Sequence, residues 1–203
     1  MKWFNQNLIY LICCALVLFV SVNSQEVAMV IKDENKNAIK LVVETKIPDA
    51  AGVHKLIGNA SYQGKEFAIA FFLVLQKEYF ISKNKYPVIV SLHNVVESIG
   101  GSDGNTGLLS EGLGLLMKAD IGADTRHSGE WPAIKFNPWK DAQFIGILPQ
   151  TPKDKGFHDM PMSGVVVEII NWVEKNYRVD SDRCSLTGFS YGGSCTWAVG
   201  MQF

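Results

Sequence analysis

Short apolar runs separated by polar or glycine-rich breaks recur along the chain after its first two dozen residues. Runs rich in valine, isoleucine, leucine and phenylalanine predict strands. The predicted strands are Val27–Ile31, Ile39–Thr45, Phe67–Leu75, Tyr86–Leu92, Phe144–Leu148 and Arg183–Thr187. The fourth of these reads YPVIVSL, a nearly continuous apolar run that is typical of a strand covered on both faces and therefore of a parallel sheet.

Helical spacing of apolar residues appears between the last two predicted strands. It predicts an amphipathic helix over Ser163–Tyr177, with Ser163 as its cap. A second helix is expected from Gly192 onward, and a third at Leu108–Met117 inside the glycine-rich stretch His93–Lys140. Because parallel strands need crossover connections, this order predicts an α/β fold with a mostly parallel sheet and helices on both faces.

The first residues resemble a targeting segment more than a structural element. Lys2 precedes an apolar run from Leu8 to Val20, and small or polar residues follow up to Ser24. The run is shorter than the ~20 apolar residues that a spanning helix needs. We therefore expect a signal peptide over residues 1–24, export of the protein, and no stable membrane anchor. Residues 25–203 would then be the N-terminal part of a single domain.

Composition limits the classes of partner. The chain has 203 residues and a formal net charge of -1, so it has no basic surplus for nucleic acid. His54, His127 and His158 are expected in loops, and the pairs that His127 and His158 form with nearby aspartates have too few ligands for a metal. We predict no metal and no cofactor. Cys184 and Cys195 could pair with each other or with cysteines elsewhere.

The sequence Gly188-Phe189-Ser190-Tyr191-Gly192-Gly193 carries the strongest chemical signal. It fits G-x-S-x-G between a predicted strand and a predicted helix. A serine at such a sharp turn takes a strained backbone conformation, and its neighbours must be small so that the adjacent chain can pass. Ser190 is therefore the predicted nucleophile, and Gly188, Gly192 and Gly193 are the predicted glycines of the elbow.

The start of a helix after Ser190 also favours negative charge. The backbone N–H of Tyr191 is the expected first donor of an oxyanion hole. The second should come from the loop after an earlier strand, at Asn94 or Val95. Losing one such donor typically costs ~3 kcal/mol of transition-state stabilisation.

Three segments resemble a known family. YPVIVSLHN, FIGILPQ and VDSDRCSLTGFSYGGSCTWAV are similar to segments of the secreted α/β-hydrolases that include predicted peptidases, polyhydroxybutyrate-depolymerase-like enzymes and family-one carbohydrate esterases. The resemblance covers approximately Phe67 to the end. It implies an α/β-hydrolase fold, a serine nucleophile at Ser190, and ester or peptide bonds as substrates. It also suggests that Trp197 packs against the sheet.

Two departures from the family pattern bear on activity. Asn94 stands where the family has glycine, although asparagine tolerates left-handed backbone angles. No Asp, Glu or His follows Ser190, so the acid and the histidine of a triad, and the strands that carry them, are expected beyond Phe203. His93 as a substitute base is the less favoured alternative. The glycine-rich stretch also holds Trp131, Phe136 and Trp139, which could line a pocket or pin the loop.

The first functional hypothesis is a secreted serine esterase that acts on small-molecule or polysaccharide esters through an acyl-enzyme at Ser190. A serine peptidase with the same machinery is the enzyme alternative. The third possibility is a truncated, non-catalytic product. In that case the exposed edge of the last predicted strand would favour aggregation.

Overall fold

The structure, a computed structural model, describes residues 38–94, 98–99, 143–153 and 155–202. Its strands are β1 (Lys40–Val43), β2 (Gly52–Tyr62), β3 (Lys65–Leu75), β4 (Tyr86–Leu92), β5 (Ile145–Gln150) and β6 (Val179–Gly188). Its helices are α3 (Lys77–Ile81), α6 (Met162–Asn176) and α7 (Tyr191–Gln202). Residues from Ile39 onward belong to one compact unit.

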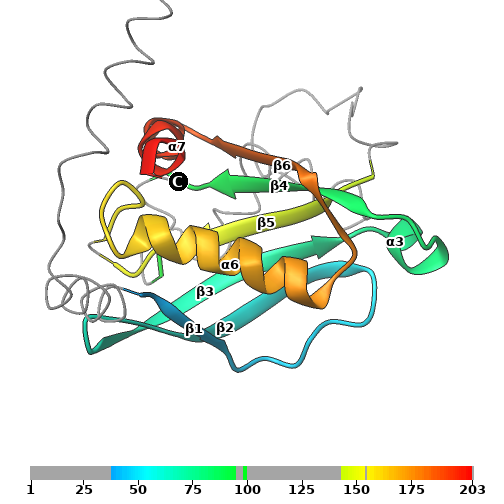
Figure 1. Ribbon diagram of the computed structural model, residues 1–203, viewed down its shortest axis with the longest axis horizontal. Coiled ribbons are helices and arrows are strands. Elements are labelled where there is room, and N and C mark those ends of the chain that lie inside the picture. The colour runs from blue at the N-terminus through cyan, green and yellow to red at the C-terminus, as the bar shows by residue number, and fades with distance from the viewer. Residues whose placement is uncertain (1–37, 95–97, 100–142, 154, 203) are drawn as a thin grey trace, which may run out of the picture. The chain divides into compact units, whose positions relative to one another are not determined.

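The six strands form one mixed sheet in the order β1-β2-β3-β5-β4-β6 (Figure 1). The pairs β1/β2, β2/β3 and β3/β5 are antiparallel, whereas β5/β4 and β4/β6 are parallel. The predicted α/β class is confirmed, because α6 provides the crossover between two strands that run in the same direction. The prediction of a mostly parallel sheet is wrong for the described strands, since three of the five pairings are antiparallel.

The antiparallel half depends on a tight hairpin that the sequence analysis missed. β2 and β3 pair along eleven positions, from Gly52↔Leu75 to Tyr62↔Lys65. Gln63 and Gly64 form the connection with φ values of 50° and 75°. Two successive residues with positive φ are typical of the type I′ turn, whose twist matches that of the flanking strands. β2 also corrects the placement of His54, which lies in this strand and not in a loop.

The parallel half agrees closely with the sequence pattern. β4 has the predicted bounds, and β5, β6 and the crossover helix lie where apolar runs or helical spacing indicated them. The predicted cap is wrong: α6 begins at Met162 after Pro161, and Ser163 is a buried residue of its first turn. The predicted helix from Gly192 is confirmed as α7, one residue earlier.

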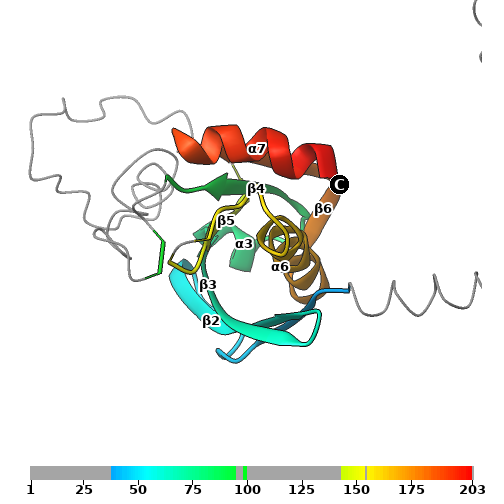
Figure 2. The same cartoon turned by 90° about the vertical axis from the view of Figure 1, so that its left-hand side faces the viewer.

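The core lies between α6 and the alternate residues of the central strands. Val88, Val90 and Leu92 of β4 are fully buried in one cluster with Ile169 and Val173 of α6. Figure 2 shows α6 inside the curve that the strands make. Cys195 and Val199 of α7 belong to the same cluster. Helices on both faces of the sheet therefore stay a prediction, because the two long helices that the structure describes share one core.

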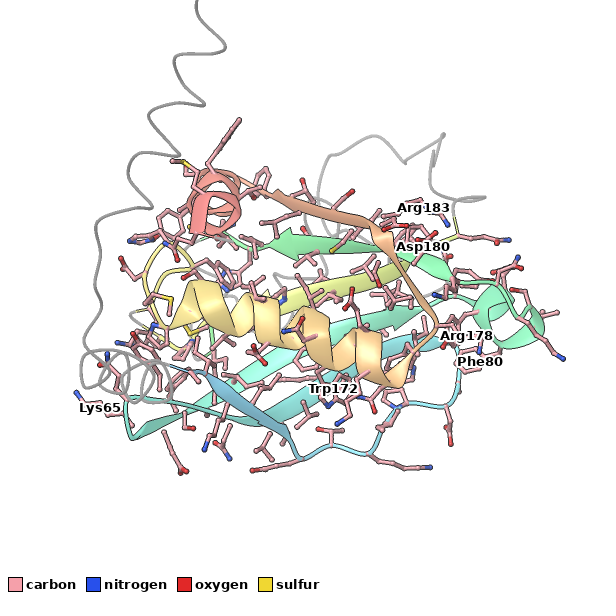
Figure 3. All side chains as sticks on the ribbon, viewed as in Figure 1. Lys65, Phe80, Trp172, Arg178, Asp180 and Arg183 are labelled. Atoms are coloured by element: carbon pink, nitrogen blue, oxygen red, sulfur yellow. The ribbon has the colours of Figure 1, made fainter. Side chains whose placement is uncertain are left out.

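A single arginine ties the chain before β6 to the region of α3. The guanidinium of Arg178 donates to the carbonyl oxygens of Tyr79, Ser82 and Asn84, and it lies 4.1 Å from the centre of the Tyr79 ring. Figure 3 labels Arg178 ahead of β6, and the Asp180–Arg183 ion pair (2.8 Å) follows within β6. These contacts fix where β6 enters the sheet.

Several predicted features lie outside the described residues. They are the signal peptide at residues 1–24, the strand Val27–Ile31, the helix Leu108–Met117, and Val95, His127, Trp131, Phe136 and Trp139. Of the helices in the part of the chain that the structure describes, none has the length and apolar character required to cross a membrane.

Truncating the core contact of α6 should reveal how much this packing stabilises the fold. Ile169 is 1% exposed, and Ile169→Ala should lower the free energy of unfolding by about 2–5 kcal/mol, since it removes buried methyl groups and leaves a cavity. Ile81→Ala is the matched control, because Ile81 is 83% exposed at the end of α3. Urea unfolding of both variants measures the difference, and equal losses would contradict the described core.

Candidate active site

Ser190 lies at the turn between β6 and α7. β6 ends at Gly188 and α7 begins at Tyr191, so only Phe189 and Ser190 separate them. Ser190 has a φ of 51°, in the left-handed region that residues with a side chain rarely adopt. Such a conformation costs about 1–3 kcal/mol and persists only where the surroundings hold it. The strained serine that the motif predicts is therefore present.

Two glycines make this turn possible. A Cβ atom built on Gly188 would collide with the backbone of Gly192, and one built on Gly192 would collide with the carbonyl oxygens of Leu92 and His93. Gly193 is less restricted, because its Cβ would lie 3.3 Å from the Gly188 oxygen. At Gly188 and Gly192 only a hydrogen fits between neighbouring backbones. The assignment of Gly188, Gly192 and Gly193 as the glycines of a nucleophile elbow stays a prediction.

Backbone hydrogen bonds hold the turn in place. Phe189 N–H donates to the carbonyl of Leu92 (3.1 Å), which joins the elbow to the end of β4. Gly192 N–H donates to Phe189 O (2.8 Å), and Gly193 N–H donates to Ser190 O (3.0 Å). Tyr191 is the first residue of α7, so its N–H is among the four that lack an acceptor within the helix. The role of the Tyr191 N–H as an oxyanion donor stays a prediction. The position of this N–H at the start of α7 is consistent with that role.

The predicted second donor lies at the same edge of the sheet. β4 and β6 are parallel, and Leu92 pairs with Gly188. Asn94 and Ser190 each follow two residues after this pair, so both lie past the carboxyl ends of adjacent strands. This is where open α/β sheets bind ligands. Val95 falls outside the described residues, and the choice between Asn94 and Val95 as donor stays open.

His93 occupies a structural position. Its side chain is buried; Nδ1 bonds the carbonyl of Asn94, and Nε2 accepts from the backbone N–H of Thr151 (3.0 Å). Burial lowers the pKa of His93 below its ordinary value of 6.5. Both ring nitrogens are engaged by backbone groups, so His93 joins the ends of β4 and β5 and is not placed to take a proton from Ser190.

His158 is the residue of this region that sequence reasoning missed. It was expected as an ordinary loop residue, and it does lie in the loop before α6. Its Nδ1 bonds the hydroxyl of Tyr191, next to Ser190, and its Nε2 lies 3.0 Å from a carboxylate oxygen of Asp159. His158 and Tyr191 are 33 positions apart, so no local pattern could have indicated the contact.

Other predicted side-chain placements have mixed outcomes. Trp197 was assigned to the core, but it is 78% exposed. Cys195 and Val199 form the buried stripe of α7, and Trp197, which lies between them in sequence, is on another side of the helix.

The two cysteines in the described part of the chain, Cys184 and Cys195, are both free thiols, so they do not pair with each other. Burial raises the pKa of the Cys195 thiol. Within the described ranges no three His, Cys, Asp or Glu side chains gather as metal ligands; the absence of a metal stays a prediction.

No protein-family model matches the chain, and no curated protein does. Three solved structures that are similar to it are hydrolases by name. A thermostable esterase is 20% identical with a TM-score of 0.46, over 81% of this chain and 38% of its own. The S-formylglutathione hydrolase of Agrobacterium tumefaciens is 13% identical (TM-score 0.43, 79% and 57%). A ferulic acid esterase of the anaerobic fungus Anaeromyces mucronatus is 18% identical (0.42, 77% and 56%).

The chain thus spans between 38% and 57% of the length of these three proteins.

Adding one methyl group at the elbow should test its crowding. Gly188→Ala should lower the free energy of unfolding by about 1–3 kcal/mol, because the new Cβ meets the Gly192 backbone. In Gly200→Ala the methyl meets nothing within 4 Å, and alanine in a helix should stabilise by up to about 1 kcal/mol. Urea unfolding compares the two. A Gly188→Ala variant as stable as the parent would contradict the described turn.

Acidification should weaken the fold through His93. Its pKa is held below the ordinary 6.5, so the unfolded chain takes up a proton first as the pH falls. The free energy of unfolding should therefore be fully expressed above pH 6.5 and decrease as the pH drops below that value. Denaturant unfolding between pH 7.5 and 5 measures this slope. It should become shallower in His93→Gln, which lacks the buried ring, and an unchanged slope in this variant would contradict the assignment.

Proposed function

We propose that this chain carries the nucleophile of a secreted serine hydrolase that cleaves carboxylic esters through an acyl-enzyme at Ser190. The observation that carries the proposal is the elbow itself. A serine with positive φ stands between a strand and a helix, and two glycines let the backbones pass. Strained residues of this kind cluster at active sites, where the strain holds a reactive group in place. The apolar run Leu8–Val20 supports the proposed export.

The elbow fits the first step of acyl transfer. Ser190 is exposed, so its hydroxyl is accessible to a substrate. Its Oγ would attack the carbonyl carbon of the ester while a general base takes the hydroxyl proton. The negative charge that develops on the carbonyl oxygen would be stabilised by the N–H of Tyr191 and by a second donor at Asn94 or Val95. The alcohol then leaves, and water releases the acid from Ser190.

The base and the acid that this reaction needs are not in the segment after the elbow. Residues 191–203 contain no histidine, aspartate or glutamate. A non-catalytic product that keeps the fold of the elbow is the second candidate. A peptidase remains the enzyme alternative, because the same nucleophile and oxyanion donors act on amide bonds and only the pocket distinguishes the substrates.

A fluorophosphonate probe tests the proposal on the natively expressed protein. Such a probe bonds only an activated serine, so labelling should occur and should be lost in Ser190→Ala. Ser194→Ala is the matched control, since Ser194 is an exposed serine on the first turn of α7, and it should label like the parent. The intact mass of the labelled species shows whether residues 1–24 are removed.

Labelling that persists in Ser190→Ala would exclude Ser190 as the nucleophile. Absence of labelling in the parent would favour the non-catalytic product. Where labelling occurs, hydrolysis of a chromogenic acetyl ester compared with a peptide anilide distinguishes esterase from peptidase, and we expect turnover of the ester.

A further inference from the structure

One histidine fastens α7 to the loop before α6. His158 Nδ1 bonds the hydroxyl of Tyr191 and lies 3.9 Å from Sγ of Cys195. The His158 carbonyl accepts from Nε2 of Gln202 at 3.2 Å. Tyr191, Cys195 and Gln202 follow at intervals of four and seven residues, which places them on one side of the helix. The contacts therefore hold α7 at its first turn, its second turn and its end.

The space around these two rings is closely fitted. A Cβ atom added at Gly156 would collide with the Tyr191 hydroxyl and would lie 2.6 Å from the His158 ring. The rings of His158 and Tyr191 meet edge to face, with centroids 5.6 Å apart. A glycine at position 156 thus leaves room for this arrangement of the pair, which a larger side chain would disturb.

Asp159 decides which nitrogen of His158 carries the proton. An ionised carboxylate can only accept, so the Nε2 that lies 3.0 Å from Asp159 must be the protonated nitrogen of the neutral ring. Nδ1 is then an acceptor, and the Tyr191 hydroxyl donates to it. The ordinary pKa of a tyrosine hydroxyl is 10.0, and that of Tyr191 is raised, so the hydroxyl is protonated at neutral pH and can donate. The hydrogen bonds therefore run in one consistent sense: Tyr191 donates to His158, and His158 donates to Asp159.

We propose that His158 is a positioning residue for the oxyanion site: held in one tautomer by Asp159, it fixes the side chain of Tyr191 and thereby the direction of the backbone N–H of that residue. The inference rests on the proposed function of Ser190. His158 is not the general base, because Tyr191 occupies its Nδ1 and Asp159 occupies its Nε2. It acts through Tyr191, one residue after the nucleophile.

Two amide substitutions separate positioning from simple packing. In His158→Asn the side-chain oxygen lies near the place of Nδ1 and can accept from Tyr191. In His158→Gln the amide reaches the place of Nε2 and keeps only the bond to Asp159. Fluorophosphonate labelling of Ser190 should slow about tenfold in His158→Gln and in Tyr191→Phe, a fraction of the 10²–10³ that loss of a whole donor costs. It should stay within about threefold of the parent in His158→Asn.

Where an ester is turned over, kcat should fall in His158→Gln and KM should stay unchanged, since the N–H acts on the transition state. His54→Gln is the matched control in β2, which β3, β5 and β4 separate from β6, and it should label like the parent. Urea unfolding of the two His158 variants gives their stabilities. Equal labelling rates in His158→Asn and His158→Gln, whether fast or slow, would overturn the proposal.

A second measurement does not depend on activity. In protein with ¹⁵N-labelled tyrosine, the amide signal of Tyr191 is the one that Tyr191→Phe removes. It should move in His158→Gln and stay near its parent position in His158→Asn. If the parent protein is not labelled by the probe, the proposed function fails and this signal alone decides the positioning role. An amide signal that stays in place in His158→Gln would overturn that role.

Discussion

The elbow and the end of β4 approach each other closely, backbone against backbone. Gly192 lies so near the carbonyl oxygens of Leu92 and His93 that no side chain fits, and the N–H of Phe189 donates to Leu92. Because β4 and β6 are parallel and in register there, the approach places Ser190 at the carboxyl edge of the sheet. The position of the candidate nucleophile follows from the packing of main chain on main chain.

This approach would be unfavourable without the core beneath it. A positive φ at a residue with a side chain costs about 1–3 kcal/mol. Burial of apolar groups at about 25 cal/mol per Å² offsets such costs, and α7 contributes Cys195 and Val199 to the cluster that α6 and β4 share. The helix after the elbow is thereby held against the sheet, and the turn cannot relax without exposing these side chains. The strained conformation of Ser190 is therefore maintained by the packing of α7 in the core.

The sequence was sufficient where burial and periodicity agree. β4 was predicted with its observed bounds because both of its faces are apolar, and the elbow was predicted because its glycines are required locally. β2 was missed because a glycine between short apolar runs, here Gly58, commonly signals a break. It is instead a position where β1 passes so closely that a Cβ would meet Val42. The Gln63-Gly64 turn lacks the asparagine or aspartate that usually signals a hairpin, so the antiparallel half of the sheet went unpredicted.

Contacts between distant segments could not be read from a local pattern, and the histidines show why this matters. His54, His93 and His158 all looked like residues of loops or strand ends, yet their partners give them different chemistry. A buried ring between two backbone groups, as in His93, stays neutral and joins two strands. A ring between a carboxylate and a hydroxyl, as in His158, has a fixed tautomer and can orient its neighbour. The role of each ring depends on a partner that is distant in sequence, Thr151 for His93 and Tyr191 for His158. Only the fold brings that partner to the ring.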